Sequence, residues 1–188
     1  MTVSEDDARR AIRTLVEFLG DDPDREGLAE TPARVVRALR EHYKGYREDP
    51  ASHLKTVFSE TDSYQDIISL ERIPFLSHCE HHMAPFEGFV SIAYIPTDKV
   101  VGLSKLARLV DGYAKRLQIQ ERLTMQIGHA LENSLAPQGV AVYIQAKHSC
   151  MQHRGIKKAG GWLGTRYFSG DFKADPNLRR EFIHSATQ

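Results

Sequence analysis

The chain contains two cysteines, and histidines cluster around both of them. Cys79 opens the run Cys79-Glu80-His81-His82, and Cys150 lies 71 positions later in the run His148-Ser149-Cys150. Five of the nine histidines lie within three residues of a cysteine. Thiolates and imidazoles are the ligands that zinc prefers, and a catalytic zinc keeps one position open for a reactive water. The sequence therefore predicts a catalytic metal site that two distant segments build together.

The predicted ligands are Cys79, His82 and Cys150. Cys79 and His82 are three residues apart, which is close enough to bind one ion from a tight turn. A single free cysteine is more often a buried apolar residue than a ligand, but the surrounding histidines favour a metal. Two thiolates disfavour a hard ion such as magnesium. The sequence has no His-Glu-x-x-His helix and no second half of a zinc deaminase signature.

Charged residues beyond the cysteine runs indicate an anionic ligand. Ser104 is placed to cap a helix that carries Lys105 and Arg108 in its first turns, where a phosphate would bind the positive helix end. Arg154 follows the second cysteine by four residues and would place positive charge near the metal. Glu121 begins the next helix; it either compensates the helix dipole or binds the amidine edge of a guanine. A solvated helix face is the ordinary interpretation of the other basic residues.

Composition excludes several classes of protein. The 188 residues suit one domain with an extension, and 25 basic residues balance 25 acidic ones. This balance gives no indication of a nucleic-acid partner or a membrane surface, and no apolar window approaches a membrane helix. The acidic N-terminus is unlike a secretory signal, and metal-binding cysteines suit a reducing compartment. We therefore expect a cytoplasmic protein.

Hydrophobic periodicity predicts a helical extension over residues 1–60 and a mixed domain over residues 61–188. The mixed domain is expected to be α+β, with two helices on one face of an antiparallel sheet. Its order is strand-strand-helix-helix-strand-strand, followed by a short C-terminal helix. The apolar patterns that predict these elements lie at 68–70, 90–94, 106–113, 123–135, 140–146, 162–172 and 176–184.

Several motifs, in this order along the chain, resemble GTP cyclohydrolase I. None is specific alone, but four together are, and the likeness spans residues 26 to about 185. The motifs are Cys79-Glu80-His81-His82, Gly102-Leu103-Ser104-Lys105, the run from Gln118 to Thr124, and His148-Ser149-Cys150-Met151 with Arg154-Gly155.

This resemblance implies a fold, a reaction and an assembly. The fold would be the tunnelling fold, in which the sheets of several subunits join into a barrel. Members are commonly homodecamers with active sites at subunit interfaces. The reaction would convert GTP and water to 7,8-dihydroneopterin triphosphate and formate, the first step of pterin and tetrahydrofolate biosynthesis.

The resemblance also implies residue roles. The three predicted ligands would hold zinc, which would activate water for attack on carbon 8 of the base. His148 would protonate the imidazole nitrogen, His81 would help to open the ribose, and Ser104 would lie near the later rearrangement. The implied substrate-binding residues are Glu80, Gln120 and Glu121, of which the last two would hold the guanine, and Lys105, Arg108 and Arg154, which would neutralise the triphosphate.

One segment departs from the family pattern. Residues 159–168 lack the usual Ser/Thr-rich sequence and keep only Thr165, although the spacing from Cys150 to Phe172 is unchanged. We interpret the segment as a resurfaced edge strand. It leaves two alternatives open. One is a paralogue that forms a different product from GTP or a related purine nucleotide. The other is a non-catalytic, zinc-stabilised oligomeric scaffold, against which the retained acids and phosphate ligands count.

Overall fold

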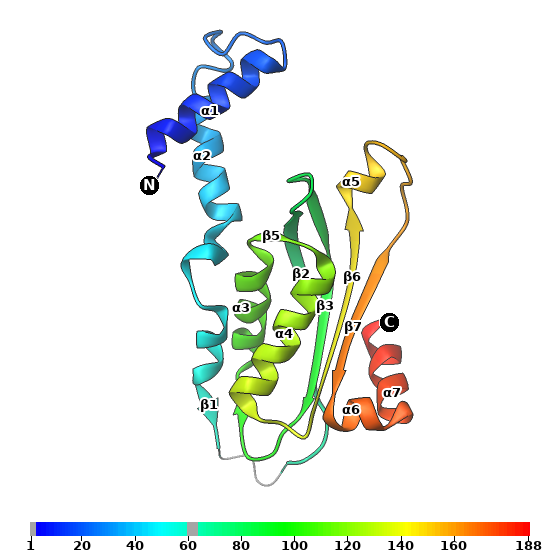
Figure 1. Ribbon diagram of the computed structural model, residues 1–188. Coiled ribbons are helices and arrows are strands. Elements are labelled where there is room, and N and C mark those ends of the chain that lie inside the picture. Colours follow the sequence, from blue (N-terminus) through cyan, green and yellow to red (C-terminus); the bar gives the residue numbers. More distant parts are fainter. Residues whose placement is uncertain (1–2, 60–63) are drawn as a thin grey trace. The chain divides into compact units, whose positions relative to one another are not determined.

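The computed structural model describes residues 3–59 and 64–188 and divides into two compact units that meet between Lys44 and Gly45. The first unit holds α1 (Glu5–Phe18) and α2 (Thr31–His42) (Figure 1). A capping box between Ser4 and Asp7 begins α1, because the side chain of each accepts a hydrogen bond from the backbone of the other. The expected domain boundary after residue 60 lies outside the described residues.

The second unit is built on a five-stranded sheet with the strand order β5-β2-β3-β6-β7. The four longer strands pair antiparallel with their neighbours, and the short β5 pairs parallel with β2. The strands are β2 (Ile68–Cys79), β3 (Pro85–Ile95), β5 (Leu117–Gln118), β6 (Gly139–His148) and β7 (Leu163–Ser169).

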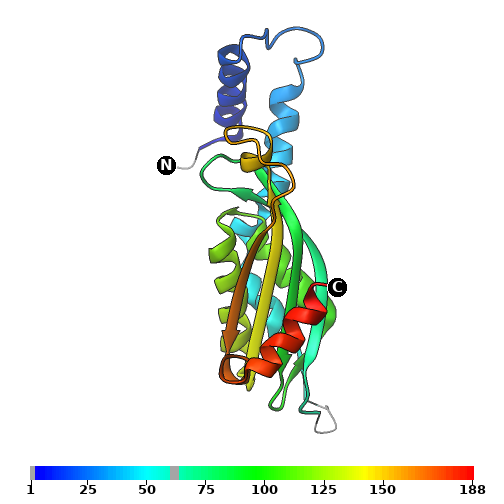
Figure 2. The same cartoon turned by 90° about the vertical axis from the view of Figure 1, so that its right-hand side faces the viewer.

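Helices cover both faces of this sheet. The helices α3 (Leu103–Ala114) and α4 (Gln120–Leu135) lie on one face, and α6 (Gly170–Ala174) and α7 (Pro176–Ala186) pack against the other (Figure 2). Successive residues of β6 accordingly belong to two cores: Val140, Val142 and Ile144 face α3 and α4, whereas Ala141 and Tyr143 face α6 and α7. Because strand side chains alternate between faces, a strand buried on both faces reads as a continuous apolar run.

Short elements complete the second unit. A 3₁₀ helix, η2 (Pro50–Lys55), contributes the fully buried Leu54 to the core under α3 and α4. The remaining short elements are η1 (Lys44–Arg47), β1 (Val57–Phe58), β4 (Val100–Val101) and α5 (Ser149–Gln152). No helix among the described residues is long and apolar enough to cross a membrane.

The predicted α+β class is confirmed. The long elements of the second unit follow one another as β2, β3, α3, α4, β6 and β7, with β4, β5 and α5 between them. The predicted cap of α3 is wrong. Gly102 is the N-cap residue and makes no side-chain capping bond, so Ser104 lies within the first turn. The extended backbone of Gly102 starts the helix earlier than the Ser104 pattern indicated.

Candidate metal centre and active site

The register of the sheet brings the two cysteines to one end of the molecule's core. Phe86 of β3 pairs with Ser77 of β2 on one side and with His148 of β6 on the other. Cys79 lies two residues beyond Ser77, and Cys150 lies two residues beyond His148. Strand pairing therefore places both cysteines at the same end of the strands, which we call the cysteine end of the sheet.

A tight turn after β2 carries His82. The backbone N–H of Cys79 donates to the carbonyl of Ala84 at 2.8 Å, and the N–H of Met83 donates to the carbonyl of Cys79 at 2.8 Å. Met83 adopts a left-handed backbone conformation with φ of 52°. This reversal folds the turn back, so that Nδ1 of His82 lies 3.9 Å from Sγ of Cys79.

Cys79, His82 and Cys150 form a group that could hold a metal ion. Their ligand atoms all lie within 4.8 Å of one another, and Cys79 is only 6% exposed. Ligands of a tetrahedral zinc at about 2.0–2.3 Å from the ion would lie roughly 3.3–3.8 Å apart, so a small closure fits the ion. Two sulfurs and one imidazole nitrogen also suit zinc chemically. His81 lies outside this group, although its Nδ1 is 3.8 Å from Sγ of Cys79.

The electrostatic setting of the thiols also suits a cation. Burial raises the pKa of the Cys150 thiol, and the neighbouring Cys79 raises it further. Two adjacent thiolates repel each other in a partly desolvated site, whereas a divalent cation between them reverses that balance. The positive charge of Arg154 opposes the rise in this pKa.

His148 is held beside the metal group by packing and by one hydrogen bond. Its ring stacks on Phe86 with the ring centroids 4.5 Å apart and the planes 5° from parallel. Its Nε2 lies 3.0 Å from Oε1 of Gln120. Burial lowers the pKa of His148, and the charge of Glu121 opposes this shift. The stacking and the hydrogen bond thus hold the ring in one position and orientation.

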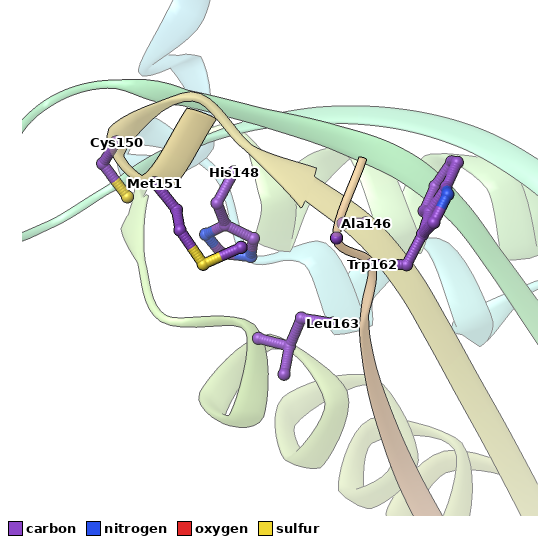
Figure 3. A pocket seen from close by; sticks show the side chains of 7 residues that line it. Ala146, His148, Cys150, Met151, Trp162 and Leu163 are labelled. Carbon is purple, nitrogen blue, oxygen red and sulfur yellow. The ribbon is translucent and has the colours of Figure 1, made fainter. Parts of the chain in front are cut away.

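A pocket of about 410 Å³ opens beside His148 and Cys150. Figure 3 shows a close view of this pocket with its lining side chains as sticks. Part of its wall comes from the segment after Arg154 that departs from the family pattern. The lining residues are Ala146, His148, Cys150, Met151, Gly161, Trp162 and Leu163.

The start of α4 also lies at the cysteine end. The backbone N–H of Glu80 donates to the carbonyl of Gln118 at 2.9 Å. Arg122 donates to both carboxylate oxygens of Glu80, at 2.6 and 3.2 Å, and these bonds lower the pKa of Glu80. The sequence pattern assigned Arg122 only to a solvated helix face. Its partner could not be predicted, because only strand pairing brings the two segments together.

Ser104, Lys105 and Arg108 do not lie at the cysteine end of the same chain. The N–H of Val101, just before α3, donates to the hydroxyl of Tyr94 at 3.1 Å. Tyr94 is eight residues along β3 from Phe86, which at about 3.3 Å per residue is roughly 26 Å. The start of α3 therefore lies at the far end of the sheet from the metal group.

These features define an α+β protein with two cysteines and a histidine grouped where they could hold a metal ion, and with His148 lining the same pocket as Cys150. The sequence model described as GTP cyclohydrolase I matches residues 8–187. The chain therefore belongs to the GTP cyclohydrolase I family, which confirms the family and the enzyme class predicted from its motifs.

Three similar proteins named GTP cyclohydrolase 1 come from bacteria. The protein of Pelagibacter ubique is 49% identical over 96% of this chain and 90% of its own length. That of Rickettsia bellii is 48% identical over 96% of this chain and 94% of its own length. That of Hyphomonas neptunium is 49% identical over 98% and 90%. A crystal structure described as the archaeosine synthase QueF-Like in the apo form matches 55% of this chain and 93% of its own at 22% identity, with a TM-score of 0.45.

Proposed function

We propose that this protein converts GTP and water to 7,8-dihydroneopterin triphosphate and formate, with zinc as its cofactor, in the first step of pterin and tetrahydrofolate biosynthesis. The observation that carries the proposal is the group formed by Cys79, His82 and Cys150, together with His148, which lines the same pocket as Cys150. When bound, zinc supplies a Lewis acid that makes water nucleophilic near neutral pH. Free thiols as ligands suit a reducing compartment, so we also propose the cytoplasm as its location.

The two histidines divide the proton transfers in this proposal. His148, fixed between Phe86 and Gln120, would move a proton to the imidazole nitrogen of the base as that ring opens. His81 is exposed beside Cys79 and would act on the ribose. Their different surroundings support this division, because the half-buried ring of His148 is held in one orientation by Phe86 and Gln120, whereas the exposed ring of His81 can follow a substrate that changes shape.

Substrate recognition would use charged groups at the cysteine end. Glu121 is exposed at the start of α4, where its carboxylate could accept hydrogen bonds from two N–H groups of guanine. Glu80 would remain ionised beside it because of its two hydrogen bonds from Arg122. Arg154 would bind the phosphate chain through charge-assisted hydrogen bonds.

We further propose that the protein is a homodecamer in which the sheets of several subunits join into the barrel of the tunnelling fold. Each active site would be completed by a second copy of the chain. Ser104, Lys105 and Arg108 are proposed to act near the same substrate as the metal group. Within one chain α3 begins beside Tyr94, about 26 Å along β3 from Phe86 at the cysteine end, and this separation is beyond the reach of a single bound nucleotide. A neighbouring chain could supply them from the far end of its own sheet.

Mixed oligomers test whether the site is shared. Cys150→Ser lacks a metal ligand, and the double variant Lys105→Ala, Arg108→Ala lacks the proposed phosphate contacts. Each alone is expected to be nearly inactive at low GTP concentration. Oligomers that contain both chains in equal amounts, purified through a different tag on each, are expected to have about a quarter of the sites intact. Mixed oligomers no more active than the separate variants would show that the site lies within one chain.

The reaction itself is tested by mass spectrometry of the products. Zinc-loaded protein incubated with GTP is expected to release formate and a product with the mass of GTP plus water minus formic acid. A ring-opened product that keeps the formyl carbon would instead indicate the paralogue. Unchanged GTP in the presence of stoichiometric zinc would indicate the scaffold. Chelator-treated protein serves as the control and is expected to leave GTP unchanged.

A further inference from the structure

The side chain of Gln120 is buried and fully engaged within the chain. Gln120 is 1% exposed, although the family resemblance implied that it holds the guanine. Its Nε2 lies 3.1 Å from the carbonyl of Ile144, 3.0 Å from that of Leu163, and 3.1 Å from Oγ1 of Thr165. Carbonyl oxygens only accept, so these contacts define which end of the amide carries the hydrogens. Oε1 of Gln120 therefore faces His148.

The two threonines around Gln120 complete a directed chain of hydrogen bonds. The hydroxyl of Thr124 donates its only hydrogen to the backbone carbonyl of Gln120 at 2.8 Å. In the 2.7 Å contact between the two hydroxyls, Thr165 must then donate to Thr124. Oγ1 of Thr165 still has lone pairs to accept from Nε2 of Gln120, whose two hydrogens are shared among this hydroxyl and the carbonyls of Ile144 and Leu163. The direction of each hydrogen bond in this chain therefore fixes the direction of the next one.

From this chain we infer that Gln120 and Thr165 are positioning residues that hold His148 in the tautomer with hydrogen on Nε2. An amide oxygen can only accept, so Nε2 of His148 must donate to it. Nδ1 is then the nitrogen that holds and moves the substrate proton. Phe86 adds a second restraint, because stacking fixes the plane of the ring. This inference rests on the proposed role of His148.

The same chain explains how the segment 159–168 can depart from the family pattern. Leu163 contributes only its backbone carbonyl to Gln120, so its side chain is free to change. Thr165 contributes its hydroxyl, and it is the one residue of the usual Ser/Thr-rich sequence that this chain keeps. The departures therefore leave the positioning contacts of His148 intact.

The direct test is the tautomer of His148 in full-length, zinc-loaded protein labelled with ¹⁵N-histidine. The His148 signals are assigned by their absence in His148→Ala. The wild type is expected to show hydrogen on Nε2 and an unprotonated Nδ1. Gln120→Met keeps the side-chain length but removes the amide, so hydrogen on Nδ1 is expected to become populated. A wild type with hydrogen on Nδ1, or a tautomer unchanged in Gln120→Met, would overturn the inference.

Kinetics with a matched pair of variants provides a second readout. Thr165→Val keeps the shape but removes the hydroxyl, and Thr165→Ser keeps the hydroxyl. We expect kcat to fall about tenfold in Thr165→Val and about 10²-fold in Gln120→Met, with KM little changed, and Thr165→Ser to retain most of kcat. A raised KM with unchanged kcat in Gln120→Met would instead make Gln120 a substrate ligand and refute the inference.

The threonine pair keeps the test decisive if Gln120→Met fails to fold, because the tautomer can be measured in both threonine variants. Hydrogen populated on Nδ1 in Thr165→Val but not in Thr165→Ser supports the inference, and no difference between them refutes it. Failure of the proposed function is distinguishable. In that case the wild type would release no formate from GTP, while the tautomer measurements would stand unchanged.

Discussion

Replacing Cys150 with serine is expected to remove the metal and the catalytic turnover together. Wild-type protein should contain about one zinc per chain, held by three side chains with one position open. Serine is a much weaker ligand for zinc than a thiolate, so only Cys79 and His82 would remain. Elemental analysis of the purified variant should show little zinc, and formate release from GTP should fall to background.

A control substitution at the neighbouring residue distinguishes the loss of a metal ligand from a general disturbance of α5. Ser149→Ala changes the residue next to Cys150 in α5 without removing a proposed ligand, and it should keep both zinc and turnover. Retention of stoichiometric zinc in Cys150→Ser would contradict the assignment of this ligand. Full turnover of wild-type protein without bound metal would contradict the proposed cofactor.

The second large effect is expected for His148→Ala, which should keep the metal and lose turnover. The ring is proposed to transfer a proton, and it is not one of the three grouped side chains that could hold the metal. Removing a general acid or base typically lowers the rate by about 10²–10⁴-fold. Zinc content and kcat measured on the same preparation test both halves of this expectation.

Two further measurements keep this result interpretable. The variant removes a ring that packs on Phe86, so its thermal unfolding should be compared with that of the wild type. His153→Ala removes an exposed histidine just beyond α5, and it should leave zinc and turnover near their wild-type values. Loss of zinc in His148→Ala would make His148 a ligand and would reverse the roles proposed here.

The hydrogen-bonded chain around Gln120 shows what residue types alone could not predict. The motif at the start of α4 indicated a polar residue near the substrate, and Gln120 does lie at the cysteine end. Its burial and its three acceptors depend on β6 and β7 passing on the same side of α4. Such contacts join residues 24 to 45 positions apart, so sequence spacing carries no information about them.

Residue types and their spacing were enough to predict the α+β class, the family and the candidate ligands. Periodic apolar residues must be buried, so their spacing reports helices and strands directly. The chemistry of thiolates and imidazoles likewise follows from residue type, so Cys79, His82 and Cys150 could be named before any fold was known. The first residue of α3 was predicted less well. Ser104 was expected to cap this helix, but the extended backbone of Gly102 makes Gly102 the N-cap residue.

Which of the predicted residues share one end of the sheet depends on strand pairing and could not be predicted from residue types. The register of β2, β3 and β6 brings Cys79, His148 and Cys150 together. The length of β3 carries the start of α3, with Lys105 and Arg108, to the opposite end. The longest strands and helices, such as β2, β3 and α4, each span roughly 24–40 Å, so a motif's position along the chain does not reveal the end at which it lies. Pairing between strands, which depends on contacts distant in sequence, supplies that information.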